Sequence, residues 1–461
     1  MLTDFIERIP VRYWVIALLV VWGGISLFLL RHDAYGLDEG AARALLLNWS
    51  VVDNVANPVV TFGVPDFRAL FFIPLGMYWS GNLMAAKVFT LLIAFAAAVL
   101  LYQWRERVAG KEVALIATGL LLICPVTLLQ IDSLGAGPYL LALFAYGALL
   151  DQSYRAIGPP LGGKYFTQMV LVAAVVTLHP AGLAYPVALA WGWYKNPVSA
   201  RNQKYMYLGM AIALAFISLL CAGWHGLEYW SNPVTALQSA IFGPAPSDTS
   251  IAGVFLAIIL VVVTLVNRRR LLEDLMGTML LFALILGALA ADLSWAMLAV
   301  VIVIYYGISS LIRLNESLGG TDFLRQRGGV MLVIVIVATV FMNVDKGYYS
   351  YTQAGLLSAR DELIRTLALD AADTAKPFRA ASQWPARTMI VVKRDVLPLP
   401  PAAKDPETLL KMIPGITHIM FDPYNGANLD LARNISQLSG VLETLAPQPG
   451  GVIVRMRTHT E

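Results

Sequence analysis

The sequence predicts a polytopic α-helical membrane protein that ends in a small α/β domain. Of its 461 residues, 58% are hydrophobic and only 14% are charged. The mean hydropathy of +0.67 indicates more apolar material than one soluble core of this length would bury. The apolar residues form long runs up to residue 343 and much shorter ones after it. We therefore expect a membrane domain at 1–343 and a soluble domain at 344–461.

About eleven apolar runs in the membrane domain are candidates for helices that cross a bilayer, whose hydrocarbon core requires roughly 20 apolar residues in an α-helix. The fifth and sixth runs meet at Pro180 and Pro186, so they are either two short helices or one kinked span. No small-residue cleavage site follows the first run, which we expect to be retained as a helix. The runs lie at 13–30, 84–102, 113–129, 137–151, 165–180, 181–194, 205–222, 251–266, 274–291, 293–312 and 329–343.

The distribution of Lys and Arg sets the orientation of these spans. Basic residues occur at the N-terminus and in alternate connections such as WRERVAGKE and KNPVSARNQK, whereas QIDSLGAG and LHPAG contain none. Because cytoplasmic connections carry the excess of positive charge, the N-terminus is predicted to be cytoplasmic, and 165–180 and 181–194 count as two helices. The first external loop, 31–83, and the C-terminal domain then lie on the periplasmic or extracellular side of the cell inner membrane.

The C-terminal domain alternates helices with short strands. Helical periodicity is present in ARDELIRTLALDAA, DPETLLKMI and NLDLARNISQLSGVLETL, and short apolar strands are predicted at TMIVVK, THIMFD and GGVIVRM. This alternation is typical of an α/β domain. In an external position, the domain is a candidate surface for a membrane-protein partner.

Two adjacent acidic residues, Asp38 and Glu39, follow the first apolar run in YGLDEGAARALLLNW. In a structural interpretation, Asp38 caps a short amphipathic helix and Glu39 lies in its first turn, where negative charge is favourable. In a functional interpretation, a carboxylate at the membrane surface removes a proton from an acceptor hydroxyl or binds a divalent cation. The two interpretations are compatible.

The first loop also has a recognisable order of features. A span from the inside is followed by Asp-Glu and a small residue, a surface helix, and then a proline and a hydrophobic stretch that lead into AKVFTLLIAF. This order resembles the membrane-embedded glycosyltransferases of the GT-C fold, particularly the bacterial relatives of protein mannosyltransferases and aminoarabinose transferases. The resemblance implies a GT-C-like membrane domain, a polyprenyl-phosphate-linked sugar donor, and Asp38 as the catalytic base with Glu39 beside it.

The sequence departs from the family pattern at two places. WSVVDNVANP replaces a Gly-Asp pair that often follows the surface helix, and DSLGAGPYLL replaces a charged Arg-Tyr cluster, which leaves Asp132 and Tyr139. The alternative hypothesis is therefore a non-catalytic GT-C-like scaffold or partner-binding subunit. The retained Asp38 and Glu39 favour an enzyme. A transporter is disfavoured because the middle of each span lacks charged residues.

Two cations on the predicted external side, Arg68 and Lys87, are candidate ligands of the donor phosphate. Arg offers a bidentate fork and Lys a point charge to a phosphate group. In the alternative interpretation, Lys87 extends its side chain from the apolar run toward the lipid headgroups.

Three further polar residues, Asp132, Tyr139 and His179, are candidates for substrate binding. Asp132 either caps the helix that follows it or acts as a second acid that binds a metal or the acceptor. His179 is alternatively a polar anchor at an interface. The sequence lacks an HExxH motif, so Asp38 and Asp132 are the candidate ligands if a divalent cation takes part. Asp292 is expected to cap a helix.

These interpretations predict that a sugar is transferred, with inversion, from a polyprenyl-phosphate donor to a hydroxyl of a glycan, lipid or protein acceptor. The reaction would take place at the outer face of the membrane, among membrane lipids. The formal charge of +3 gives no indication of nucleic-acid binding.

Overall fold

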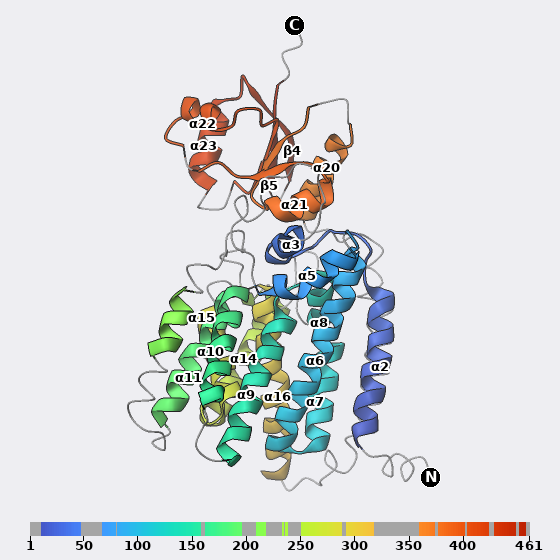
Figure 1. The fold of residues 1–461 in the computed structure, drawn as a ribbon, viewed down its shortest axis with the longest axis vertical. Coiled ribbons are helices and arrows are strands. Elements are labelled where there is room, and N and C mark those ends of the chain that lie inside the picture. Colours follow the sequence, from blue (N-terminus) through green and yellow to red (C-terminus); the bar gives the residue numbers. More distant parts are fainter. Residues whose placement is uncertain are drawn as a thin grey trace. The chain divides into compact units, whose positions relative to one another are not determined.

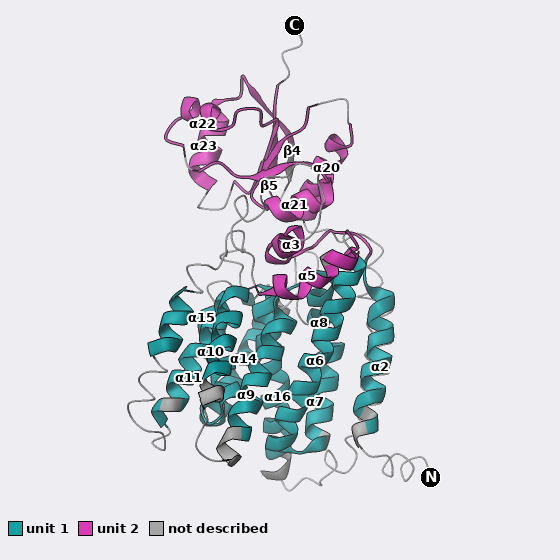
Figure 2. Ribbon diagram, viewed as in Figure 1, with its two compact units in different colours: residues 1–31, 84–356 teal, residues 32–83, 357–461 magenta. Residues whose placement is uncertain are grey.

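The computed structural model divides the chain into two compact units (Figures 1 and 2). The first contains residues 1–31 and 84–356, and the second contains 32–83 and 357–461. The predicted external loop therefore groups with the C-terminal residues. The structure describes residues 11–47, 67–79, 81–157, 162–195, 209–217, 233–234, 236–237, 250–287, 292–317, 359–373, 377–401, 403–423, 428–448 and 451–457. The run predicted at 329–343 and both ends of the run predicted at 205–222 lie outside these residues.

The first unit is a bundle of helices that run alongside one another (Figure 1). They coincide with the predicted apolar runs in the described part of the chain, and α16 contacts both α7 and α14. The helices are α2 (Val11–Leu29), α6 (Leu83–Ala109), α7 (Lys111–Ile123), α8 (Pro125–Asp132), α9 (Gly137–Ile157), α10 (Gly162–Leu178), α11 (Ala184–Lys195), α14 (Ser250–Leu271), α15 (Leu275–Gly287) and α16 (Leu293–Ser317), with a 3-10 helix, η1 (Pro180–Leu183), between α10 and α11.

The surface of this unit is apolar enough to face lipid. Phe28 of α2 is 84% exposed and Leu265 of α14 is 60% exposed, which water would disfavour over a contiguous surface. Among the described residues, Leu83–Ala109 and Leu293–Arg313 are each long and apolar enough to cross a membrane, and α7 with α8 is a third candidate if the bent pair is one span. These helices support a helical membrane protein, and the count of eleven spans stays a prediction.

Two breaks in the bundle follow from proline residues. The run at 113–129 is two helices bent by 54°, because Pro125 begins α8 and cannot continue the hydrogen-bond ladder of α7. Between α10 and α11, η1 folds back on α10, and a Cβ on Gly182 would lie 2.0 Å from the carbonyl oxygen of Val175. The runs at 165–180 and 181–194 are accordingly two separate helices, as predicted.

The second unit contains a mixed five-stranded sheet in the order β2-β1-β3-β5-β4. β1 pairs in parallel with β2 and β3, whereas β5 pairs antiparallel with β3 and β4. The elements are α3 (Glu39–Leu46), α5 (Arg68–Trp79), α20 (Ala359–Ala371), β1 (Ala380–Ser382), α21 (Pro385–Val392), β2 (Val396–Pro398), α22 (Pro406–Met412), β3 (His418–Phe421), α23 (Leu429–Gln437), β4 (Leu442–Gln448) and β5 (Gly451–Met456).

Helices cover both faces of this sheet. Ile419 and Phe421 of β3 pack in a core with Leu409 of α22 and Leu431 of α23. Since side chains alternate along a strand, His418 lies on the opposite face, where its ring meets Asp370 of α20. The sheet thus separates α22 and α23 from α20.

Two secondary-structure predictions for this unit were wrong. TMIVVK is not a strand, because most of it lies in α21, which begins with Pro385, ends at Val392 and is followed by Lys393 in a left-handed conformation. Its buried apolar side chains, including Met389, Ile390 and Val392, show that packing overrides the β-propensity of the run. The last predicted helix also ends early, at Gln437, and Leu442–Gln448 pairs with β5 as β4.

Candidate functional site

Asp38 is held at the start of α3 by two donors to the same carboxylate oxygen. Oδ1 accepts a hydrogen bond from the Ala41 N–H at 2.9 Å, which caps the helix as predicted. Oδ1 also lies 2.6 Å from Nη2 of Arg68, the first residue of α5. The Arg68 side chain is 2% exposed and that of Asp38 is 22% exposed. Within the described part of the chain, the hydrogen bond from Ala41 and the short contact with Arg68 both fall on Oδ1, so this oxygen is the anchored one.

The Glu39 side chain contacts α21, whereas that of Asp38 contacts α5. Its Oε1 accepts a hydrogen bond from the N–H of Ala386 at 2.9 Å, and its Oε2 accepts one from the N–H of Arg387 at 3.1 Å. Burial raises the pKa of the Glu39 carboxyl, against the opposing effects of Arg43 and of these two N–H groups. Both carboxylate oxygens of Glu39 thus bind the first turn of α21, and its predicted place beside the catalytic base stays a prediction.

Lys87 belongs to a buried charge cluster in the first unit. Its Nζ lies 2.7 Å from Oδ1 of Asp132 and donates to the backbone oxygen of Arg31 at 2.8 Å. Asp132 also accepts from the N–H of Arg31 at 3.1 Å and from its Nε at 2.7 Å. The side chains of Lys87, Asp132 and Arg31 are 0%, 4% and 7% exposed. Lys87 therefore does not reach for the headgroups, and Asp132 is not a helix cap.

This cluster fixes three helix ends to one another. Arg31 follows the C-terminus of α2, Lys87 lies in the second turn of α6, and Asp132 is the last residue of α8. Tyr139 of α9 lies nearby in the same unit, where its hydroxyl pairs with Oγ1 of Thr90 at 3.0 Å. The structure thus gives Asp132 and Tyr139 partners within the fold. Sequence reasoning missed Arg31 and Thr90 as partners; Arg31 is a charged residue just beyond the end of α2, whereas Thr90 lies inside α6, where no local pattern marks it.

His179 and Asp292 form a second buried contact in the first unit. Nδ1 of His179 accepts a hydrogen bond from the N–H of Ala181 at 3.1 Å and so caps η1. Nε2 lies 3.1 Å from Oδ2 of Asp292, which caps α16 through the N–H of Trp295 as predicted. With Nδ1 acting as an acceptor, the proton of a neutral ring resides on Nε2 and faces the carboxylate. We therefore interpret His179 as a link between η1 and α16.

The described residues do not fit a divalent metal ion. Asp132 faces two cations, and a metal there would meet their positive charge. Asp38 is paired with Arg68, and the adjacent Glu39 binds backbone N–H groups. No three His, Cys, Asp or Glu side chains converge within the described ranges.

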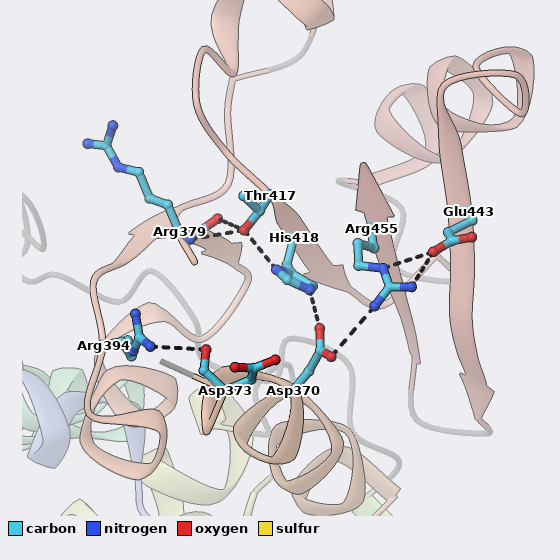
Figure 3. Close-up of polar contacts among 8 residues, drawn as sticks. All are labelled: Asp370, Asp373, Arg379, Arg394, Thr417, His418, Glu443 and Arg455. Carbon is cyan, nitrogen blue, oxygen red and sulfur yellow. Dashed lines mark hydrogen bonds and ion pairs between the residues drawn. The ribbon is translucent and has the colours of Figure 1, made fainter. Parts of the chain in front are cut away.

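A polar network on the α20 face of the sheet was not predicted (Figure 3). His418 lies between Asp370, 2.6 Å from its Nε2, and Thr417, 2.8 Å from its Nδ1. Arg455 of β5 joins Asp370 at 3.6 Å and Glu443 of β4 at 2.8 Å. Burial lowers the pKa of His418 although Asp370 opposes this effect. Because these partners all lie within the fold, the network connects α20 to the sheet.

Comparison with solved structures reveals the architecture. The chain is similar to the archaeal oligosaccharyltransferase AglB from Archaeoglobus fulgidus in complex with an inhibitory peptide and a dolichol-phosphate, with a TM-score of 0.53 and 10% identity over 97% of this chain and 74% of that chain. The same oligosaccharyltransferase in complex with Zn and sulfate gives a TM-score of 0.50 and 12% identity over 94% and 72% of the two chains. ArnT from Cupriavidus metallidurans bound to undecaprenyl phosphate gives 0.48 and 13% over 96% and 97%.

No protein-family model matches the sequence, and no curated protein is significantly similar to it. The similarity to the oligosaccharyltransferase extends over nearly the whole chain, at an identity that speaks to the fold alone. The predicted resemblance is confirmed at this level: the chain has the GT-C fold of membrane glycosyltransferases.

Proposed function

We propose that the protein is a membrane glycosyltransferase that takes a sugar from a lipid-phosphate-linked donor and uses Asp38 as its general base. The observation that carries this proposal is the geometry of the Asp38 carboxylate. Arg68 and the Ala41 N–H anchor Oδ1, and the proposed partner of Oδ2 is the acceptor hydroxyl. A carboxylate fixed in this way is ready to accept a proton without rearrangement.

The reaction would be a single displacement. Oδ2 of Asp38 takes the proton of the acceptor hydroxyl as the hydroxyl oxygen attacks the anomeric carbon of the donor. The bond from that carbon to the phosphate oxygen breaks, and the lipid phosphate leaves with the electron pair. One displacement inverts the anomeric configuration. The likeness in fold to an oligosaccharyltransferase whose structure is in complex with a dolichol-phosphate supports a polyprenyl-phosphate as the leaving group.

The roles proposed for the two predicted phosphate ligands change. Arg68 contacts the Asp38 carboxylate, so we propose that it holds the base in position. Lys87 is fully buried and binds Asp132, so we propose that it stabilises the ends of α6 and α8.

The proposal is tested by supplying the purified full-length chain with polyprenyl-phosphate-linked hexoses. Water can replace the unknown acceptor, and the release of free hexose with formation of polyprenyl phosphate is followed by mass spectrometry. We expect saturable hydrolysis of at least one donor and saturable binding of the polyprenyl phosphate in native mass spectra. A protein that binds no polyprenyl phosphate and hydrolyses no donor would instead be the non-catalytic scaffold.

A further inference from the structure

Helix α21 has no N-terminal cap in its own segment. Its cap residue, Trp384, makes no side-chain hydrogen bond to the helix, and Pro385 occupies the first position. The N–H groups of the next two residues, Ala386 and Arg387, point out of the first turn and need acceptors. A side-chain oxygen near the helix start normally supplies this contact.

Glu39 supplies the missing cap from 347 residues away in the sequence. Each of its two carboxylate oxygens accepts one of the two N–H groups, at 2.9 and 3.1 Å, and the residue is only 7% exposed. A negative charge at this position also interacts favourably with the helix dipole. Hydrogen bonds from N–H groups to a carboxylate are among the stronger ones in proteins.

The start of α21 is a place where α/β proteins bind anions. It follows the carboxyl end of β1, which pairs in parallel with both β2 and β3. The connection through α21 leads to β2 on one side of β1, whereas β3 lies on the other side. Ligands of open α/β sheets bind at such a switch point, and helix N-termini bind their anionic groups. In this chain, the carboxylate of Glu39 occupies that position.

A second contact holds the other side of Asp38. The N–H of Gly36 donates to Oδ1 of Asp361, in the first turn of α20, at 2.9 Å. Nη2 of Arg387 is also bonded to this oxygen. Gly36 has a φ of 75°, a backbone conformation that glycine adopts without strain. Asp38 therefore lies between two residues that are tied to α20 and α21.

We propose that the C-terminal α/β region positions Asp38 by binding its neighbour Glu39 as an anion at the N-terminus of α21. Glu39 and Asp361 are then positioning residues, and the segment of residues 36 to 39 is aligned by α20 and α21 and not by α3 alone. This inference rests on the proposed role of Asp38 as the base. It explains why the two adjacent carboxylates differ in role: Glu39 anchors the loop to α21, and Asp38 accepts the proton of the acceptor hydroxyl.

The anchoring is tested by hydrogen exchange of the full-length protein, without reference to activity. In Glu39→Ala, amides in the first turn of α21 should exchange about two- to thirty-fold faster than in the wild type, the range expected for loss of a helix cap. Glu39→Gln retains one acceptor oxygen, so its amide exchange rate should lie between the rates of Glu39→Ala and the wild type. The matched control is Glu407→Ala, which removes an exposed acid in the first turn of α22 and should leave α21 unchanged. Unaltered exchange in both Glu39 variants overturns the proposal.

The positioning role is tested by donor hydrolysis. Glu39→Ala should lower kcat about tenfold or more with little change in KM, because a small displacement of a catalytic group is costly. In an Asp38→Asn background the same change should have no further effect on kcat, since groups that act as a unit are not additive. If Glu39→Ala does not fold, Glu39→Gln takes its place in both comparisons.

The outcomes separate this inference from the proposed function. Faster exchange with an unchanged kcat, or an equal further loss in the double variant, would show that Glu39 does not act through Asp38. Full activity of Asp38→Asn alone would instead remove Asp38 as the base. The exchange experiment would then still decide whether Glu39 holds α21.

Discussion

Replacing Asp132 by Asn tests the buried cluster of Arg31, Lys87 and Asp132 most sharply. The substitution preserves shape and removes only the negative charge, so it leaves two cations in a site where the side chains are at most 7% exposed. Removing one partner of a buried ion pair costs about 3–5 kcal/mol. At roughly 2 °C per kcal/mol for a large unit, the melting temperature should fall by about 6–10 °C.

The assay is thermal denaturation of the purified full-length protein in detergent. Glu273→Gln is the matched control, because Glu273 is an exposed acid of the same unit. Adding Lys87→Met to Asp132→Asn should cost less than the sum of the two single changes, since it removes one of the unpaired cations. A melting temperature for Asp132→Asn equal to that of the control would show that the three charges do not stabilise the bundle.

Three more predictions concern the fold. Gly182→Ala should destabilise the protein by about 1–3 kcal/mol through overpacking against the Val175 carbonyl, whereas Gly192→Ala, with no atom within 4 Å of the added Cβ, should be neutral or stabilising in thermal denaturation. Because the pKa of His418 is lowered from 6.5 on folding, the unfolded chain binds more protons below that pH. The free energy of unfolding should therefore fall as the pH drops from about 6.5 toward the folded pKa, and His418→Gln should remove this slope in pH-dependent denaturation. Single cysteines at Ser133 and Ser247 should react with an impermeant thiol reagent from outside and one at Ser199 should not; equal labelling would contradict the predicted topology.

Local sequence patterns predicted the features that depend on neighbouring residues, namely helices, helix caps and helix breaks. The apolar runs gave the helices of the bundle, and the Asp before an amphipathic stretch gave the cap of α3. Pro180 begins η1 at the break between α10 and α11, whereas Pro186 lies in the first turn of α11. At α21 the same local reasoning failed, because a run of β-branched residues with a proline at its start folds as a helix when both its packing and its cap come from elsewhere.

Contacts between segments that are distant in the sequence could not be predicted from local sequence patterns. Asp132 meets Arg31 across 101 residues and Lys87 across 45, and Glu39 meets α21 across 347. A buried lysine with a carboxylate partner and a lysine that reaches toward the headgroups have the same local sequence pattern. The contacts of Lys87, Arg68 and Glu39 are therefore seen only in the three-dimensional structure.

The rate of donor hydrolysis in Asp38→Asn decides whether Asp38 is the base of a glycosyl transfer. The amide keeps the shape of the side chain and its cap on Ala41 but cannot take a proton. If Asp38 is the base, kcat should fall about 10²–10⁴-fold while circular dichroism shows an intact fold. The control is Asp33→Asn, which changes an exposed acid of the same loop and should retain the wild-type rate. A wild-type rate in Asp38→Asn would contradict the claim.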